Sequence, residues 1–462
     1  MAMPVHGIIL AAGKGTRMKS ELPKGLFAVA GLPMAQLIGR AMRDAGVERP
    51  IVVIGYGGEL LKDALGDDYE YVWQHEQLGT GHAALMAEPL LADKQGPVLI
   101  TPGDTPLIDG EMLRQVVETH LTARAECTLA TVRLPDPSGY GRIVRDPHNR
   151  VRRIVEDRDA TPRERQIQEI CTSVYCINAP TLLGFLPRLG NRNAQGEYYL
   201  TDIVEAIYDA GGLVETRHFD DLDMLRGVND RWQLAQAGRL VRERILKRIA
   251  LGGVTIVDPS STYIEFDVEV GADTVIEPFT AILRGSRIGA GCRIGPNTRI
   301  QSSIVSDGVR VSMSCLEDAV VEVGATVGPY ARLRPGTVVG PGARVGNFVE
   351  LKNTKLAADA RVPHLSYVGD ATVGEHTNIG AGTITCNYDG FVKHPTVVGT
   401  NAFVGSNSTL VAPVTIGDGA MIAAGSVITA DVPPNALGVG RARQEVKEEW
   451  VAKWRKRKSS TE

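Results

Sequence analysis

The sequence has 462 residues, which is too long for one ordinary hydrophobic core, so two domains with connecting segments are expected. With 43% hydrophobic and 23% charged residues it has the composition of a soluble globular protein, and no segment approaches about 18 uninterrupted apolar residues, which argues against a membrane span. The net charge of −4 gives no reason to expect a nucleic-acid partner.

The first part of the chain, about residues 1–228, alternates between strand-like and helix-like segments. Residues 5–10 read as a buried strand, and further strands are expected at 51–54 and 98–101. Helical patterns lie between and after them, at about 34–45, 58–65, 80–91 and 110–121. This alternation predicts an α/β domain with a mostly parallel sheet.

The loop that follows the first strand is rich in glycine and carries two cations, with the sequence G-K-G-T-R at 13–17. Backbone N–H groups in such a loop can face an anion without interference from Cβ atoms. It is not a Walker A loop, because Gly15 stands where Ser or Thr is needed, and Met18 replaces the third glycine of a dinucleotide fingerprint. By itself the loop indicates either a phosphate site or an ordinary glycine turn.

The six cysteines are spaced too irregularly for a disulfide framework, and none forms a C-x-x-C pair. They stand at positions 127, 171, 176, 292, 315 and 386. Reduced thiols are typical of the cytoplasm. The apolar run at residues 7–12 is too short for a signal peptide and lacks a basic flank. The sequence therefore predicts a cytoplasmic location.

Residues 229–250 predict a helix that links two halves of the chain, with Gly252-Gly253 as its C-terminal signal. Between Ile264 and Ile428 an apolar residue recurs every six residues, with breaks, and this period fits neither an amphipathic helix nor an alternating strand. The three unbroken series are Ile264, Val270, Ile276, Ile282, Ile288, Ile294 and Ile300; Val327, Leu333, Val339, Val345 and Leu351; and Val398, Val404, Leu410, Ile416, Ile422 and Ile428. This period predicts a parallel β-helix of hexapeptide repeats, with three faces closing a coil of about 18 residues.

The six-residue period fails at residues 352–372 and again at 386–397. Insertions in a repeat protein map to its loops, and loops on a rigid scaffold commonly carry function. The first segment contains His364, which could act as a base near neutral pH, and the second contains Asn387. We expect both segments to form loops.

The tail at 442–462 carries Trp450 and Trp454 four residues apart, followed by four basic residues at 455–458. It predicts a solvated or loosely docked helix, with contact to RNA or a membrane as the alternative.

Several longer motifs occur in a fixed order along the chain. In the first half they are L-A-A-G-K-G-T-R-M (10–18), L-P-K (22–24), Q-H-E-Q-L-G-T-G-H (74–82), G-D-T-P-L (103–107), G-Y-G-R-I (139–143), I-V-E-D-R-D-A (154–160), G-E-Y-Y-L-T-D (196–202) and G-V-N (227–229). In the second half they are V-P-H-L-S-Y-V-G-D (362–370), N-I-G-A-G-T (378–383) and C-N-Y-D-G (386–390). With these motifs the chain resembles the bacterial family of bifunctional N-acetylglucosamine-1-phosphate uridylyltransferases and glucosamine-1-phosphate acetyltransferases.

The resemblance implies four parts. They are a Rossmann-like nucleotidyltransferase (pyrophosphorylase) domain at 1–228, a linker helix at 229–250, a left-handed parallel β-helix acetyltransferase domain at 251–441 and a C-terminal tail at 442–462. It further implies that acetyl-CoA, UTP and a sugar-1-phosphate are substrates, that Mg²⁺ is required, and that the protein is a homotrimer with sites between subunits.

In the first half, the sugar phosphate would attack the α-phosphorus of UTP, so positioning and charge neutralisation replace a protein nucleophile. Arg17 and Lys24 would supply fixed cations, and Asp104 at a strand end would bind Mg²⁺. By the resemblance Asn229 completes the metal site, although an asparagine at a helix start is also an ordinary N-cap. The residues implied to bind UTP or UDP-N-acetylglucosamine are Leu10, Ala11, Ala12, Gly13, Lys24, Gln74, Gly79, Thr80, Pro102, Gly103, Asp104, Gly141, Glu156, Cys171 and Asn229.

Three positions depart from the family pattern. Pro102 stands where the family usually has Tyr, Cys171 where it has Asn, and Gly25 where it has a branched apolar residue. A thiol is a weak hydrogen-bond partner compared with an amide. We therefore expect uridylyl transfer to survive with weaker or looser recognition of the sugar.

In the second half, His364 would take the proton of the amine that receives the acetyl group. The resemblance implies that Arg334, Lys352, Tyr367 and Asn378 bind glucosamine phosphate. It implies that Ala381, Asn387, Tyr388, Ser406, Ala424 and Arg441 bind acetyl-CoA. For Arg334 and Lys352 a solvated outer face of the β-helix is the alternative.

Three other functions fit parts of the sequence. The first is a nucleotidyltransferase with a single activity, whose β-helix only regulates it or holds a trimer together. The second is an assembly scaffold without enzymatic activity. The third is a β-helix metal hydratase that uses His364, His376 and His394, although it leaves the predicted α/β domain unexplained.

Overall fold

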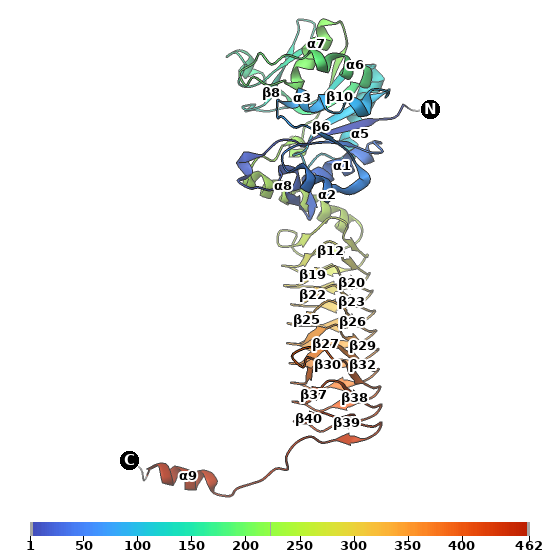
Figure 1. The fold of residues 1–462 in the computed structure, drawn as a ribbon, viewed down its shortest axis with the longest axis vertical. Helices are drawn as coiled ribbons and strands as arrows, with labels where there is room; N and C mark the ends of the chain where they lie inside the picture. Colours follow the sequence, from blue (N-terminus) through green and yellow to red (C-terminus); the bar gives the residue numbers. More distant parts are fainter. Residues whose placement is uncertain (1–2, 222, 460–462) are drawn as a thin grey trace. The chain divides into compact units, whose positions relative to one another are not determined.

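The computed structural model describes residues 3–221 and 223–459 (Figure 1). The chain divides into two compact units, Met1–Arg244 and Ile245–Glu462. The first is an α/β domain and the second is built almost entirely of short parallel strands.

The first unit is organised around a nine-stranded sheet with the order β11-β7-β10-β6-β1-β4-β5, to which β8 and β9 are attached beside β10. Strands β6, β1, β4 and β5 are parallel, whereas β10 runs antiparallel to both of its neighbours. The strands are β1 (His6–Leu10), β4 (Ile51–Ile54), β5 (Glu70–Trp73), β6 (Pro97–Pro102), β7 (Cys127–Arg133), β8 (Gly141–Arg145), β9 (Val151–Val155), β10 (Glu169–Asn178) and β11 (Val214–His218). A separate two-stranded ribbon pairs β2 (Ala28–Val29) with β3 (Leu32–Pro33).

Helices cover both faces of this sheet, because successive residues of the central strands point to opposite sides. Ile8 belongs to the core cluster that includes α3, α6 and α7, whereas Ile9 belongs to the cluster that includes α1 and α5. The helices are α1 (Met34–Asp44), α2 (Gly58–Leu65), α3 (Thr80–Leu85), α4 (Glu88–Leu91), α5 (Gly110–Ala123), α6 (Ala179–Phe185) and α7 (Ile203–Asp209). This is the predicted Rossmann-like arrangement.

The predicted extent of one helix differs from the structure. The segment predicted as a single helix at 80–91 forms two helices, α3 and α4. Pro89 lies in the first turn of α4. Proline lacks the N–H that a continuous helix needs and is favoured in a first turn, so a new helix starts here. Helix α8 (Arg231–Leu251) then spans the region predicted as the linker.

The second unit is a column of three parallel sheets, in which each strand pairs with the third strand before and after it, apart from the strands at the sheet ends and the last pair, β39 with β41. Among the described residues, the first sheet runs from β12 (Thr255–Ile256) to β41 (Leu437–Gly438) and has eleven strands. The second runs from β13 (Tyr263–Ile264) to β40 (Val427–Ile428), and the third from β14 (Glu269–Val270) to β38 (Val414–Ile416). The predicted left-handed β-helix of hexapeptide repeats is thereby confirmed.

The register explains the hexapeptide period. Ile264 pairs with Ile282, and Ile282 with Ile300, so each aliphatic side chain stacks on its equivalent three hexapeptides further along the chain. All three side chains are fully buried. The coil interior is therefore filled by one aliphatic residue from each face, stacked at the ordinary strand spacing.

The first predicted interruption, at 352–372, is not a loop. It contains the regular strands β29 (Lys355–Leu356), β30 (Arg361–His364), β31 (Tyr367–Gly369) and β32 (Ala371–Val373). Leu351 pairs with Val368, whereas the regular step from Ile264 to Ile282 would have paired it with Gly369. The coil is therefore slightly shorter than a regular one. Such a deletion shifts the phase of the apolar positions and resembles a break in the sequence, although every strand still pairs.

The second predicted interruption, at 386–397, is a true excursion. It lies between β34 (Ile384–Cys386) and β35 (Thr396–Val398), and Tyr388 forms an antiparallel bridge with Lys393 inside it. Ala371 pairs with Thr396, whereas the regular step would have reached Asp389. This coil is therefore longer than a regular one, and its extra residues form the excursion.

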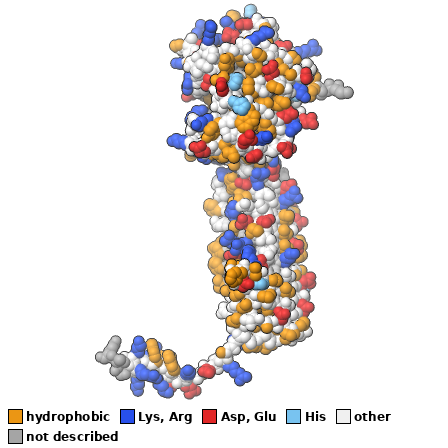
Figure 2. All heavy atoms as spheres, viewed as in Figure 1, with side chains coloured by type: hydrophobic (Ala, Val, Ile, Leu, Met, Phe, Trp, Pro, Cys, Tyr) orange, Lys and Arg blue, Asp and Glu red, His pale blue; other side chains and the backbone are white. Residues whose placement is uncertain are grey.

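The C-terminal segment forms helix α9 (Trp450–Ser459), whose residues are all exposed. Apolar and basic side chains share its surface, as the space-filling view shows (Figure 2). The predicted helix is confirmed, and whether it is solvated or loosely docked stays a prediction. Among the described helices, none is long and apolar enough to cross a membrane.

Candidate active sites

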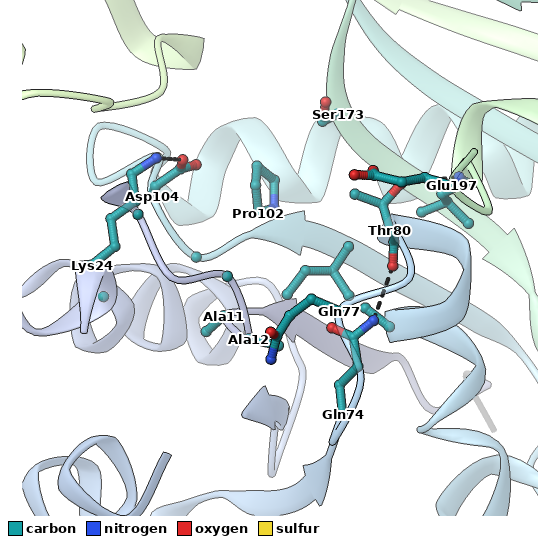
Figure 3. A pocket seen from close by; sticks show the side chains of 18 of the residues that line it. Ala11, Ala12, Lys24, Gln74, Gln77, Thr80, Pro102, Asp104, Ser173 and Glu197 are labelled. Carbon is teal, nitrogen blue, oxygen red and sulfur yellow. Dashed lines mark hydrogen bonds and ion pairs between the residues drawn. The ribbon is translucent and has the colours of Figure 1, made fainter. Parts of the chain in front are cut away.

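The first candidate site is a cavity of about 410 Å³ in the α/β unit, at the carboxyl ends of β1 and β6. The carboxyl ends of parallel strands are where such sheets bind ligands. Most of the residues predicted to bind UTP or its product line it: Leu10, Ala11, Ala12, Gly13, Lys24, Gln74, Gly79, Thr80, Pro102, Gly103, Asp104 and Glu156. In Figure 3, Lys24 and Asp104 lie at one end of the cavity, away from Gln74 and Glu197.

At the Lys24 end, a cationic cluster lies beside the glycine loop. The Lys24 ammonium donates to a carboxylate oxygen of Asp104 and to Asn229 Oδ1, the second at 2.9 Å. Arg17 Nη2 donates to the same Asn229 oxygen at 2.7 Å. Gly15 has φ +60°, a value that glycine adopts readily, and a Cβ there would lie 2.9 Å from Lys24 Cβ. The loop therefore brings backbone N–H groups and two cations to one place.

The two predicted Mg²⁺ ligands, Asp104 and Asn229, fit the role because their oxygens converge on one cation, the Lys24 ammonium. A carboxylate and an amide oxygen, completed by phosphate and water, are what Mg²⁺ prefers. Among residues 3–221 and 223–459, no group of three or more His, Cys, Asp or Glu side chains is arranged to hold a metal ion. A metal at this site would thus depend on phosphate oxygens for part of its coordination.

At the Gln74 end, the amide is held in a fixed orientation. Its Nε2 donates to Gly79 O at 3.1 Å and lies 3.0 Å from His82 Nδ1. Gly79 has φ +112°, and a Cβ there would lie 2.6 Å from Tyr198 O, so only glycine fits this turn. Gln74 is buried and lines the cavity, so a fixed amide there suits recognition of a flat base.

A third part of the cavity contains the carboxylate of Glu156. Burial raises the pKa of Glu156, while a hydrogen bond that Thr201 Oγ1 donates to its Oε1 at 3.1 Å opposes that rise. Gly141 does not line the cavity, but a Cβ there would lie 2.8 Å from Ile154 Cγ2 and 3.6 Å from the Glu156 carboxylate. Gly141 therefore leaves room beside Glu156.

The wall formed by β10 differs from the prediction. Cys171 is 3% exposed and does not line the cavity; its Sγ lies 3.6 Å from the Tyr175 hydroxyl. Ser173 and Tyr175 line the cavity instead, beside a shift of register between Cys171 and Tyr175. Sequence reasoning did not find Ser173 or Tyr175, and no motif there indicated them. Glu197 and Thr201 also line the cavity, and the motif at 196–202 was a signal that could have found them.

The second candidate site lies on the β-helix, where Arg334, Lys352 and Tyr367 follow or belong to strands stacked in one sheet. These strands are β25 (Arg332–Leu333), β28 (Glu350–Lys352) and β31. Arg334 Nη1 donates to Glu350 Oε1 at 2.9 Å. Lys352 Nζ lies 3.6 Å from Asp370 Oδ2.

Lys393, which the sequence analysis missed, joins this group from the excursion at 386–397. Its proximity to Lys352 lowers the pKa of Lys393, and Arg334 contributes in the same direction. Asp370 is the acidic partner: Asn353 and Asn387 donate to it and help to hold its pKa below the usual range. Basic side chains are visibly grouped on this column in the space-filling view (Figure 2). Arg334, Lys352 and Lys393 outnumber the two carboxylates beside them, Glu350 and Asp370, and such a group of cations is suited to a phosphate.

His364 is the last residue of β30 and is exposed. Its Nδ1 lies 2.5 Å from Asn347 Oδ1, on the preceding coil. An Nδ1–H that donates to this oxygen leaves Nε2 unprotonated and able to accept a proton. Asn347 was not predicted, because only the pairing of β27 (Arg344–Asn347) with β30 brings it to His364.

Four predicted residues form a column at one corner of the β-helix: His364, Ala381, Ser406 and Ala424. Each stands three residues after strand residues that pair in register, namely Arg361 with Asn378, Asn378 with Phe403 and Phe403 with Met421. Backbone N–H groups of the next coil donate to Ala381 O at 2.7 Å and Ser406 O at 2.8 Å. The corner residues from Ala381 to Ala424 are therefore joined by a backbone ladder, and His364 stands at the equivalent position one coil earlier, where Gly382 N–H donates to Leu365 O.

The remaining predicted residues of the β-helix lie near this ladder or in the excursion. Asn378 is the first residue of β33 (Asn378–Ile379). Arg441 lies near Ala424, because a Cβ added to the next residue, Gly425, would be 4.0 Å from Arg441 Cδ. Asn387 is buried, whereas Tyr388 is 60% exposed and its hydroxyl donates to Gly390 O at 2.5 Å.

Comparisons with known proteins agree with both halves of the molecule. A family described as "MobA-like NTP transferase domain" matches residues 7–166. Families described as "Bacterial transferase hexapeptide (six repeats)" and "Hexapeptide repeat of succinyl-transferase" match residues 267–302 and 395–430.

Full-length relatives named "Bifunctional protein GlmU" are also found. The protein of Heliobacterium modesticaldum is 48% identical over 453 residues, which cover 98% of each chain. The protein of Carboxydothermus hydrogenoformans is 47% identical, and the match covers 97% of this chain and 100% of its own. The protein of a Geobacillus species is 45% identical, and the match covers 98% of this chain and 99% of its own. The chain belongs to the GlmU family.

Membership of the GlmU family confirms the predicted bifunctional transferase, a uridylyltransferase joined to an acetyltransferase. The scaffold hypothesis and the single-activity hypothesis do not explain why the relatives that match almost the whole chain are named as bifunctional proteins. The hydratase reading also loses its geometric basis, because its histidines have separate partners: His376 Nδ1 lies 3.7 Å from Asp359, and His394 Nε2 lies 2.7 Å from Asp389.

Two of the three departures from the GlmU family pattern lie in the cavity. Pro102 and Gly25 both line it, whereas Cys171 does not. A Cβ at Gly25 would lie 3.3 Å from Ala35 Cβ, so a larger residue would require a small adjustment there. Pro102 presents a small ring without a hydroxyl to the cavity, at a position where the resemblance leads us to expect a tyrosine.

Proposed function

We propose that the α/β cavity binds UTP and N-acetylglucosamine-1-phosphate and joins them with release of pyrophosphate. The observation that carries this proposal is the arrangement of three chemically different ends in one cavity: cations at Lys24, an amide at Gln74 and a carboxylate at Glu156. Phosphates suit the first, a flat base the second and sugar hydroxyls the third.

The chemistry at the cationic end is positioning and charge neutralisation. Lys24 and Arg17 hold negative charge that spreads over the phosphate oxygens as the new bond forms, and the glycine loop adds backbone donors. Asp104 and Asn229 would hold Mg²⁺, which neutralises phosphate charge when it is bound. When these two side chains bind the metal, the Lys24 ammonium is free to contact phosphate.

On the β-helix, we propose that His364 accepts the proton of the glucosamine-1-phosphate amine during acetyl transfer from acetyl-CoA. The hydrogen bond from Nδ1 to Asn347 supports this role, since it leaves Nε2 as the base. Arg334, Lys352 and Lys393 would bind the phosphate, with Tyr367 and Asn378 beside the sugar. The ladder from Ala381 to Ala424, with Asn387, Tyr388 and Arg441, would bind acetyl-CoA.

Acetylation would come first and uridylyl transfer second, because the N-acetylated sugar phosphate is the substrate of the α/β unit. We further propose a homotrimer. Exposed apolar side chains on the β-helix support it: Phe279, Tyr330 and Leu365 are 65%, 56% and 62% exposed, and the Tyr330 ring stacks on Phe348 at 5.2 Å. Leu365 directly follows His364, so a subunit contact there would lie beside the acetyl-transfer site. The cytoplasmic location stays a prediction.

The decisive experiment supplies the purified protein with glucosamine-1-phosphate, acetyl-CoA, UTP and Mg²⁺. We expect UDP-N-acetylglucosamine, with loss of the product when either acetyl-CoA or Mg²⁺ is omitted. Formation of N-acetylglucosamine-1-phosphate without the nucleotide sugar would contradict the first proposal. A nucleotide sugar that forms only when N-acetylglucosamine-1-phosphate is supplied ready-made would contradict the second. Sedimentation equilibrium tests the trimer, and the mass of a single chain would contradict it.

A further inference from the structure

The β10 wall of the α/β cavity contains a serine in a backbone conformation that serine rarely adopts. Ser173 has φ +61°, in the left-handed region where a side chain is strained. It lies where β10 shifts its register against β7: Cys171 pairs with Thr131, whereas Tyr175 pairs with Leu129. Between these two pairs β10 has more residues than β7, and this defines a β-bulge.

At the bulge, the side chains of Cys171 and Ser173 point in different directions. The Cys171 thiol is buried and faces the Tyr175 hydroxyl, with Sγ 3.6 Å from it. The Ser173 side chain is exposed and lines the cavity. Figure 3 shows it on the β10 ribbon, on the side of Pro102 away from Gln74. Ser173 and Tyr175 are the two β10 side chains that line the cavity, and of these Ser173 is the exposed one.

The Ser173 hydroxyl is available to a ligand. In the part of the chain that the structure describes, it forms no hydrogen bond with another residue. Glu156 and Thr201 line the same cavity. This group can donate and accept hydrogen bonds to several hydroxyls or an amide on one face of a sugar.

We propose that Ser173, and not residue 171, is the β10 side chain that binds the sugar of the sugar-1-phosphate and discriminates between sugars. This inference rests on the proposed uridylyl transfer. The strained backbone is retained because it places the hydroxyl in the cavity, which the regular strand conformation would not do. The Cys171 thiol is buried against the Tyr175 hydroxyl and does not line the cavity, so it makes no contact with the sugar.

The test compares Ser173→Ala with Ser173→Gly in the full-length protein. Both variants lack the hydroxyl, and each should raise the KM for N-acetylglucosamine-1-phosphate about 3- to 10-fold, as expected for one lost hydrogen bond, with the KM for UTP changed less than twofold. Only Ser173→Gly removes the strain, so it alone should raise the thermal unfolding midpoint, by roughly 2–4 °C.

Ser302→Gly is the matched control, because Ser302 also has a positive φ, +48°, but lies on the β-helix. It should leave both uridylyl-transfer KM values unchanged. If the wild-type protein makes the nucleotide sugar and Ser173→Ala leaves the KM for the sugar phosphate unchanged, the role of Ser173 is wrong while the proposed function stands. Equal increases in both KM values would also overturn it, since they would indicate general damage to the cavity. A wild-type protein without uridylyl transfer would overturn the proposed function itself.

Discussion

The two units of this protein build their candidate sites in opposite ways. In the α/β unit, segments far apart in the sequence, such as Lys24, Asp104 and Asn229, converge at the carboxyl ends of parallel strands. In the β-helix, the site residues lie at corresponding positions on successive coils, as His364 does with Asn347 one coil earlier. One site depends on how distant elements pack, and the other depends on the register of a repeat.

The comparison implies that the two activities can be separated by single substitutions. His364→Ala should reduce kcat/KM for acetyl transfer by about 10²- to 10⁴-fold, because it removes the base, while uridylyl transfer stays unchanged. Separate assays of the two half-reactions measure this. His376→Ala is the control, since His376 is an exposed histidine on the same column that pairs with Asp359. Loss of both activities in His364→Ala would show that the units are not independent.

The opposite separation is expected for Asp104→Ala. Removing this carboxylate takes away a predicted metal ligand and the partner of Lys24, so kcat/KM for uridylyl transfer should fall about 10²- to 10³-fold. Acetyl transfer should continue at the wild-type rate. Asp109→Ala controls for the loss of a nearby carboxylate, because Asp109 caps α5 by accepting from Met112 N–H at 2.9 Å and does not line the cavity. A wild-type uridylyl-transfer rate in Asp104→Ala would remove this residue from the site.

The cations Arg334, Lys352 and Lys393 of the β-helix should affect substrate binding in that unit alone. Lys352→Ala should raise the KM for glucosamine-1-phosphate about tenfold, as for a lost charge-assisted hydrogen bond, with little change in the KM for acetyl-CoA. Lys355→Ala, an exposed lysine on the neighbouring strand β29, should leave both values unchanged. If Lys352→Ala affected acetyl-CoA alone, the phosphate would have to bind elsewhere.

The smallest expected effect concerns the stability of the α/β unit against pH. Burial and the nearby carboxylates of Glu205 and Asp159 raise the pKa of Asp202 to about 6, from 3.8. Because the folded protein holds this proton more tightly than the unfolded chain, stability falls as pH rises from about 4 to about 6. Asp202→Asn should therefore stabilise the protein at pH 7–8 by about 1 kcal/mol, after allowance for solvent screening, and have no such effect at pH 4.

Thermal unfolding of Asp202→Asn at pH 4 and pH 7.5 measures this difference. Asp209→Asn, at an exposed position of α7, serves as the control and should not change the pH dependence. An equal change of the unfolding midpoint at both pH values in Asp202→Asn would contradict the role of the buried carboxyl.

The β-helix could be predicted from the amino-acid pattern alone, because each coil repeats one local rule: an aliphatic residue such as Ile264, Ile282 or Ile300 faces inward at a fixed interval. The pattern also located the glycine loop at 13–17 and most of the residues around it, since motifs in loops are contiguous in the chain. It misplaced 352–372 as a loop, because a slightly shortened coil shifts the apolar period without breaking a strand.

Which side chains face the two sites became visible only in the folded chain. Asn347 meets His364, and Lys393 meets Lys352, through contacts between coils that no motif records. Ser173 lines the cavity and Cys171 does not, because β10 has a bulge where it pairs with β7. A one-dimensional pattern carries local periodicity, whereas the direction of a side chain at a bulge follows from pairing with a strand far away in the sequence.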